Sequence, residues 1–596
     1  MRSTFAGFTT AQLAMRASQK ALDVTGQNIA NVNTGGYTRQ RLDLISLNSS
    51  QGVNKYESQF NVKVGSGVLT KGISQIRDPF LDVRFRTERA NVGAEDQKLG
   101  ILNDLEAIFD EVSKNGVQSQ ISEISSMLQK LSSEVGNDEF DSMVKSSADV
   151  LTKMLNQYAT QLGGIREEQE TNLNIDITKV NDIMKNIQKL NETIKTNNIH
   201  GSPALELQDQ RNMLIDELSA YVKIDVKYNQ TKISDAITVE IPEISLVGAG
   251  GKLPLIKGSF AAEFKISKDA DGKVVASITR PDLSTDGANP GDPKVITPQA
   301  DIAVNDEIIS GALKATFDML NKSGEFDGGS ETTRGIGYYE KSLNILASKL
   351  AESFNKANQE SVFDKDGNQI TGIVADLAGD KVTVTVKNRN TGAETSVELT
   401  PADASVAKFD KTGKLLDGTT LAQDELYIKK DLFTSNDGNP ITAKNLTISE
   451  GWNSGEIGIT ASTKYGSPLG ANDNVLGIIS MINEKQEYKT PDKLNPDGTV
   501  AASGKKIFKG SFQEMFTNTG SVLALDVKST KSVLDNYVTV ANEIANMRDN
   551  ISSVSLDEEG MNILHYQKSY NAAARLMTAL DEAINTIINS MGIVGR

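Results

Sequence analysis

The C-terminal region carries the pattern that decides the fold. Residues 555–591 have the sequence SLDEEGMNILHYQKSYNAAARLMTALDEAINTIINSM. Because apolar residues spaced alternately by three and four positions return to one side of an α-helix, this segment predicts an amphipathic helix. Ser555 followed by Glu558 is typical of a helix start. The apolar stripe consists of Ile563, Tyr566, Tyr570, Ala573, Met577, Leu580, Ile584, Ile587 and Met591.

The N-terminal residues show the same spacing. Their stripe consists of Phe8, Ala11, Met15, Ser18, Leu22, Thr25 and Ile29. Small residues on this stripe permit a close approach by another helix, and Asn33 to Gly36 are residue types that end helices. The two terminal helices either pack only on their own protein or meet and then pack on neighbouring subunits. The pattern alone leaves both possibilities open.

Between the ends, the apolar spacing changes from helical to alternating and back twice. We therefore predict an α+β multidomain protein in which terminal helices form a coiled coil, a long helical bundle forms a stem, and two β-rich domains are inserted. Asp271-Gly272 predicts a hairpin turn in the first of these β regions. The expected division is residues 1–36 with 555–596 as the coiled coil, 37–220 with 321–375 and 464–554 as the helical stem, and 221–320 and 376–463 as the β-rich domains.

Composition excludes several classes of function. The 596 residues carry a formal net charge of −16, which disfavours binding to nucleic acid or to an anionic lipid surface. There is no cysteine, and the only two histidines are His200 and His565. These counts exclude disulfides and cysteine metal sites, and they leave few ways to build a hydrolytic centre. The N-terminus does not resemble a cleavable signal peptide, and no run of about 20 apolar residues is present for membrane insertion.

Two short motifs resemble binding loops and fail at defining positions. Asp364 to Asn368 resembles the start of a calcium loop, but Gln369 and Ala375 stand where a glycine and a bidentate acid are needed. Gly248 to Lys252 resembles a phosphate loop, but Leu253 stands where a hydroxyl residue should hold magnesium. We predict turns at both places. No catalytic residue, cofactor or metal site is expected, so the protein is not expected to be an enzyme.

The residues after the first helix carry a family resemblance. Asn28 to Arg41, NIANVNTGGYTRQR, resembles the signature shared by flagellar rod, hook and hook-associated proteins. Val64 to Val68, and Ile76 to Leu81 after it, are similar to the next block of that family. Leu207 to Arg211 resembles an internal motif of the hook-associated members, and Gln567 to Met577 resembles the C-terminal helix shared by these axial proteins.

The resemblance implies a structural adaptor at the junction between flagellar hook and filament. It implies export through the flagellar type III apparatus without a cleavable signal, and a final location outside the cell. The implied partners are further copies of the chain in a ring, the hook protein, a second junction protein (hook-associated protein 3) and a cytoplasmic export chaperone. The expected assembly interface comprises Phe8, Met15, Leu22, Ile29, Asn31, Gly36, Tyr37, Thr38, Arg39, Gln40, Tyr570, Ala573, Met577, Leu580, Ile584 and Ile587.

Three alternatives remain beside this hypothesis. The chain could be the hook protein itself, or an adhesin that uses its inserted β domains. A secreted enzyme with its activity in residues 376–463 is disfavoured, because that insert contains neither histidine nor cysteine.

Overall fold

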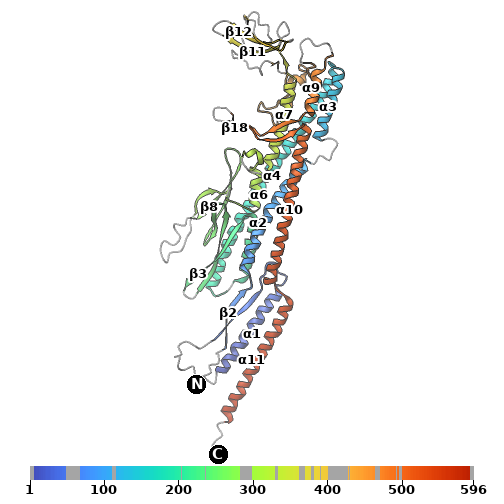
Figure 1. The fold of residues 1–596 in the computed structure, drawn as a ribbon. Helices are drawn as coiled ribbons and strands as arrows, with labels where there is room; N and C mark the ends of the chain where they lie inside the picture. Colours follow the sequence, from blue (N-terminus) through green and yellow to red (C-terminus); the bar gives the residue numbers. More distant parts are fainter. Residues whose placement is uncertain are drawn as a thin grey trace, which may run out of the picture. The chain divides into compact units, whose positions relative to one another are not determined.

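The structure is a computed structural model (Figure 1). It describes residues 6–47, 67–109, 116–202, 204–234, 237–281, 298–305, 307–328, 333–361, 369–376, 381–388, 391–399, 427–428, 430–462, 470–491, 493–494 and 500–590. The chain divides into two compact units. The first contains Met1–Lys98, Asn172–Phe317 and Thr530–Arg596, and the second contains Leu99–Thr171 and Asp318–Ser529. The four-part division expected from the sequence is finer than this and stays a prediction.

Long helices account for most of the described chain, as the sequence predicts. The terminal helices are α1 (Ala6–Ala30) and α11 (Leu556–Ser590). Residues 144–165 and 173–194 each carry helical spacing and join in one helix, because residues 166–172 contain no glycine or proline. The other long helices are α2 (Pro79–Phe109), α3 (Val117–Ser133), α4 (Asp138–Ile199), α5 (Leu205–Tyr221), α7 (Ile336–Ala357) and α10 (Phe512–Ser552).

The first unit contains the expected β region after α5. A four-stranded sheet has the order β3-β4-β5-β6, and a three-stranded sheet has the order β7-β8-β9. Gly272 has a positive φ of 75° in the turn between β7 and β8, which confirms the predicted hairpin. Gly248 and Gly251 close the turn between β4 and β5. The strands are β3 (Ile224–Ser234), β4 (Ile237–Gly248), β5 (Gly251–Lys257), β6 (Phe260–Ala261), β7 (Phe264–Lys268), β8 (Val274–Pro281) and β9 (Pro298–Ala303).

Two further strands of the first unit follow the N-terminal helix. They are β1 (Gln40–Ser46) and β2 (Val68–Gln75), and they pair antiparallel. Apolar side chains of α2, α4 and α5 are buried in the helical part of this unit. After β9, the short helix α6 (Ala312–Asn321) continues from the first unit into the second.

The second unit has a core of aromatic rings. Phe109 lies 6.2 Å from both Tyr158 and Tyr339, and 6.0 Å from Phe516, between ring centroids. The buried Trp452 donates its indole N–H to Asp141 over 3.2 Å. Its remaining helical elements are η2 (Gly324–Asp327), α8 (Glu450–Ser454) and α9 (Asp473–Asn483).

The strands of this unit require one correction. The sequence predicts helix through residues 464–554, but four short strands lie between Gln486 and Gly510. Tyr488 pairs across two of them with Phe508 and packs on Phe512. The paired strands are β10 (Glu360–Ser361) with β14 (Tyr427–Ile428), β11 (Gln369–Asp376) with β12 (Lys381–Lys387) and β13 (Glu394–Leu399), β15 (Phe433–Ser435) with β16 (Leu446–Ile448), β17 (Gln486–Lys489) with β20 (Lys506–Gly510), and β18 (Lys493–Leu494) with β19 (Val500–Ala502).

Long helices combined with small antiparallel sheets confirm the predicted α+β fold class. Three sequence predictions fall on residues outside the described ranges: the motifs at 64–66 and 364–368, and the last stripe position, Met591. Of the helices that the structure describes, none is both long enough and apolar enough to cross a membrane.

Candidate assembly interface

The two terminal helices form an antiparallel pair, which we call the terminal hairpin (Figure 1). At its open end, Gly7 of α1 faces the side chain of Leu580 on α11. At the other end, Arg39 beyond α1 reaches Glu559 in the first turn of α11. The buried face of α1 is made mostly of small residues, namely Ala11, Ala17, Ser18, Ala21, Val24, Thr25 and Asn28. Small side chains allow the two backbones to approach closely.

The structure brings the predicted apolar residues of both stripes to this hairpin without enclosing them fully. On α1, the larger residues are half-buried: Phe8, Met15, Leu22 and Ile29. On α11, Ala573 is buried, Ile587 is exposed, and four residues are half-buried: Tyr570, Met577, Leu580 and Ile584. The hairpin therefore retains apolar surface at its edges, and the role of these residues in assembly remains a proposal.

The turn after α1 is held by one buried amide. Asn28 donates to the Gln40 carbonyl over 2.9 Å, and its side-chain oxygen accepts from the Gln40 backbone N–H over 3.0 Å. The same oxygen accepts from the Tyr37 hydroxyl over 2.9 Å. Burial, followed by nearby carboxylates, raises the pKa of Tyr37 to about 12. Asn31 acts locally, donating to the Gln27 carbonyl and accepting from Thr34.

Thr38 connects this turn to the internal sequence motif. Its backbone N–H donates to Asp209 over 3.1 Å, and its hydroxyl donates to the other oxygen of the same carboxylate over 2.6 Å. Asp209 is the acidic residue of the Leu207 to Arg211 motif on α5, and burial raises the pKa of its carboxyl group. In the sequence, the motif around this turn and the motif on α5 each resemble flagellar axial proteins. Only the structure shows that they bind each other.

Arg39 connects the turn to the C-terminal helix. It donates to Glu559 over 2.7 Å and also to Glu558, while its backbone N–H donates to the Ser552 carbonyl over 2.8 Å. Although burial acts to lower the pKa of Arg39, these two carboxylates raise it overall. Glu558 therefore pairs with Arg39, while its backbone N–H lies 3.5 Å from the Ser555 hydroxyl at the start of α11. We call this meeting point of Thr38, Arg39, Asp209 and Glu559 the joint.

Gly36 is required by geometry at the joint. Its φ is 77°, a left-handed conformation that side chains with a Cβ rarely adopt. A Cβ at this position would also collide with the sulfur of Met213 on α5. Its neighbour Gly35 has nothing within 4 Å of an added Cβ. Of these two glycines, Gly36 therefore carries the constraint.

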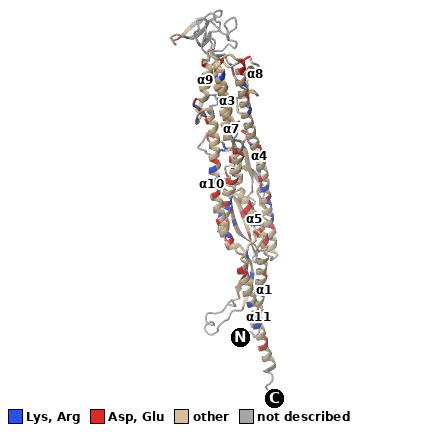
Figure 2. Cartoon of the chain, turned by 90° about the vertical axis from the view of Figure 1, so that its right-hand side faces the viewer, with Lys and Arg blue, Asp and Glu red and all other residues tan. Residues whose placement is uncertain are grey.

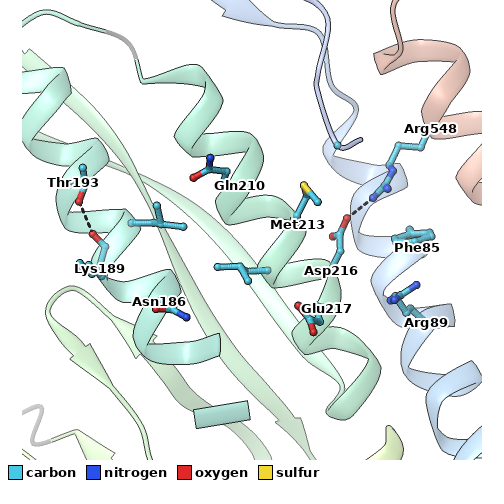
Figure 3. Close-up of a pocket in the computed structure, with 13 residues that line it drawn as sticks. Phe85, Arg89, Asn186, Lys189, Thr193, Gln210, Met213, Asp216, Glu217 and Arg548 are labelled. Atoms are coloured by element: carbon cyan, nitrogen blue, oxygen red, sulfur yellow. Dashed lines mark hydrogen bonds and ion pairs between the residues drawn. The ribbon is translucent and has the colours of Figure 1, made fainter. Parts of the chain in front are cut away.

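A groove of about 880 Å³ lies beside the joint, between α2, α4 and α5 (Figure 3). Asp216 is bridged by Arg548 over 2.6 Å and by the buried Arg86 over 2.7 Å. Arg548 also lies 4.1 Å above the centre of the Phe85 ring. Glu217 also lines the groove and pairs with Lys179 over 2.8 Å. Because both acidic residues are held by cations, this groove has the character of a structural support rather than an acid–base centre.

Within the described residues, no cluster of three or more histidine, cysteine, aspartate or glutamate residues could hold a metal ion. His565 packs edge-on against Tyr566 with ring centroids 5.6 Å apart. At the joint, hydrogen bonds and an ion pair hold the turn after α1 against α5 and the start of α11, and so fix the direction of the terminal hairpin.

Comparisons with known proteins show which proteins the chain is similar to. Residues 8–38 match a family model described as flagella basal body rod protein, and residues 102–373 match one described as flagellar hook-associated protein FlgK helical domain. A rod-protein segment on the first helix, followed by a hook-associated helical domain, is the arrangement of a flagellar axial protein.

Individual relatives indicate which flagellar axial protein the chain is similar to. The chain is 26% identical to flagellar hook-associated protein 1 of Bacillus subtilis, with 100% of both chains covered. It is 23% identical to the protein of the same name from Salmonella typhimurium, with 97% of this chain and 98% of the relative covered. The solved structure of the flagellar hook junction protein FlgK from Burkholderia pseudomallei aligns with a TM-score of 0.43 and 13% identity, over 79% of this chain and all of that one. The chain belongs to the flagellar hook-associated protein 1 family.

Proposed function

We propose that this chain is a structural component of the bacterial flagellum that acts as an adaptor at the junction between hook and filament. The observation that carries the proposal is the joint, where the turn after α1, the internal α5 motif and the start of α11 are bonded together. Such a joint holds the two terminal helices in one hairpin with a defined direction. The sequence similarity of the whole chain to hook-associated protein 1 supports the same role.

The proposed mechanism is self-assembly through the terminal helices. A pair of helices has no complete core of its own, and the larger apolar side chains of the hairpin stay only half-buried. Packing against neighbouring copies would remove this surface from water, at about 25 cal/mol for each Å². The residues proposed for the interface are those expected from the sequence, from Phe8 to Gln40 and from Tyr570 to Ile587.

The proposed partners follow from the position in the flagellum. A junction adaptor contacts further copies of itself, the hook protein on one side and hook-associated protein 3 on the other. We further propose that a cytoplasmic chaperone accompanies the chain, that the flagellar type III apparatus exports it without a cleavable signal, and that it functions outside the cell. No enzymatic role is proposed, and the hook protein is the less favoured structural alternative, because the relatives that match the whole chain are hook-associated proteins.

Electron microscopy of cells that lack the gene tests this function, together with a blot for flagellin in the medium. Complete hooks without filaments, and flagellin lost to the medium, are the expected result. Rods without hooks would identify a hook protein instead. Intact filaments on the deletion strain would contradict a junction role. Re-expression of the unaltered chain serves as the control and should restore filaments.

A further inference from the structure

The groove between α2, α4 and α5 is lined mainly by apolar surface (Figure 3). Its middle is formed by α5, with α4 on one side and α2 on the other. We call Met213 and Leu214 of α5, together with Leu190 of α4 and Phe85 of α2, the apolar floor. Met213 is 50% exposed, and the other three side chains are half-buried. The floor is therefore open to a binding partner.

The charges of the groove do not cancel. Its two acidic residues, Asp216 and Glu217, are already paired with cations of the same chain. Arg89 on α2 and Lys189 on α4 also line the groove and are exposed, and within the described residues neither has a carboxylate partner. Acidic residues are spread along the helices (Figure 2), in keeping with the net charge of −16. This acidic chain thus presents an unpaired positive charge on each side of one apolar groove.

The shape of the groove favours a helix as its occupant. The lining residues run from Gln210 to Glu217 on α5 and from Asn186 to Thr193 on α4, which at 1.5 Å per residue is about 10 Å, or two helical turns. Because the groove is walled by helices, whose backbone groups are already bonded internally, an extended segment would find no backbone partners there. A helix bonds its own backbone and presents apolar side chains along one face.

We propose that this groove binds an amphipathic helix of another protein, with large apolar side chains along one face and carboxylates on both flanks. The apolar face covers the floor, and the flanking carboxylates pair with Arg89 and Lys189. Burial of apolar surface supplies the attraction, and the two charge pairs fix the position of the helix. Gly36 lines the same groove, so the occupant also covers one side of the joint.

Fluorescence anisotropy with the purified full chain tests this site. The probe is a labelled synthetic helix of about 20 residues, with leucine along one face and glutamate on both flanks, and a second probe has lysine in place of every glutamate. Because the chain as a whole is acidic, nonspecific attraction would favour the lysine peptide. We expect the glutamate peptide to bind about tenfold more tightly or better. Equal binding, or tighter binding of the lysine peptide, would overturn the proposal.

Charge reversal locates the site. Arg89→Glu with Lys189→Glu should weaken binding of the glutamate peptide by about tenfold or more. The matched control is Arg16→Glu with Lys20→Glu, which changes the net charge by the same amount at exposed positions of the terminal hairpin and should leave binding unchanged. Circular dichroism verifies that both variants are folded. Equal weakening in both, or weakening in the hairpin variant alone, would show that the groove is not the site.

Protection of a single thiol gives a second measurement, because the chain contains no cysteine. Gln210→Cys places a thiol in the groove, and Gln19→Cys places one on the exposed side of α1 as the control. The glutamate peptide at about four times its Kd should slow alkylation of residue 210 about fivefold and leave that of residue 19 unchanged. Equal protection at both positions, or none at residue 210, would contradict the proposal.

The oligomeric state of the isolated chain distinguishes a second copy from another protein. A dimer that Arg89→Glu with Lys189→Glu dissociates would show that a second copy fills the groove, and would overturn the proposed occupant. We expect the same oligomeric state with and without these substitutions. Each of these outcomes leaves the junction role intact, because deletion of the gene tests that role separately.

Discussion

Replacement of Gly36 by alanine is the sharpest test of the joint. Alanine at a φ of 77° costs about 1–2 kcal/mol relative to glycine. Displacing the Met213 side chain from the new Cβ adds about 0.5–1.5 kcal/mol. Reduced freedom of the unfolded chain returns about 0.4–1 kcal/mol. The expected net loss in local stability is therefore about 2 kcal/mol, within limits of about 0.5 and 3 kcal/mol.

Native-state hydrogen exchange measures this loss where it occurs. The backbone N–H groups of Tyr37, Thr38 and Gln40 are all hydrogen-bonded at the joint, to Thr34, Asp209 and Asn28 respectively. A loss of about 2 kcal/mol should accelerate their exchange roughly 30-fold if they exchange by local opening. Fluorescence of the single Trp452, which lies in the second unit, should report unchanged unfolding there.

Two further variants separate the backbone strain at residue 36 from the collision with Met213. Gly35→Ala is the matched control, because its Cβ meets no atom within 4 Å, and exchange should stay the same or slow. Met213→Ala combined with Gly36→Ala should recover the part of the loss that comes from the collision. Equal exchange rates in the Gly35 and Gly36 variants would refute the reasoning. In cells, the bulkier Gly36→Val should impair filament assembly while leaving export intact, and normal filaments would contradict that expectation.

Three other predictions concern the joint, the hairpin and the second unit. Arg39→Ala should destabilise the start of α11 by about 2 kcal/mol, because it leaves the buried Glu559 without its cation, whereas Arg41→Ala at an exposed pair should change stability by less than about 1 kcal/mol. Hydrogen exchange along α11 would show both effects, and equal effects would contradict this role of Arg39. Leu580→Ala should loosen the terminal hairpin by about 1–2 kcal/mol, since it removes a half-buried side chain, while Leu576→Ala on the outer face should leave the isolated chain unchanged. Circular dichroism during thermal unfolding compares them, and an equal loss in both would show that α1 does not cover Leu580 selectively. Burial raises the pKa of Tyr338, Tyr339 and Tyr488 in the second unit, so these tyrosines ionise first in the unfolded state and the stability of the unit should fall as the pH rises above 10. Trp452 fluorescence in denaturant at pH 9 to 11.5 measures this stability, and a flat profile would contradict the raised pKa of these tyrosines.

Local spacing was sufficient to predict the long helices. The alternation of three and four positions in residues 8–29 and 563–587 identified α1 and α11, because helical periodicity is a property of neighbouring residues. Turn chemistry at Asp271-Gly272 likewise needs no distant partner. The strands from Gln486 to Gly510 were missed, since the pairing of Tyr488 with Phe508 joins residues that are 20 positions apart. Their short segments carry little periodicity of their own.

The features of the candidate interface likewise fall into those that the sequence predicted and those that only the structure showed. The sequence by itself determined that both ends are amphipathic helices, that Gly36 follows the first of them, and that the motifs are those of an axial protein. Only the tertiary structure decided that Asp209 holds Thr38, that Arg39 holds Glu559, and that Leu576 faces away from the hairpin. Periodicity defines which residues share a face, but the partner of that face depends on contacts between segments that are hundreds of positions apart, and those contacts exist only once the chain has folded.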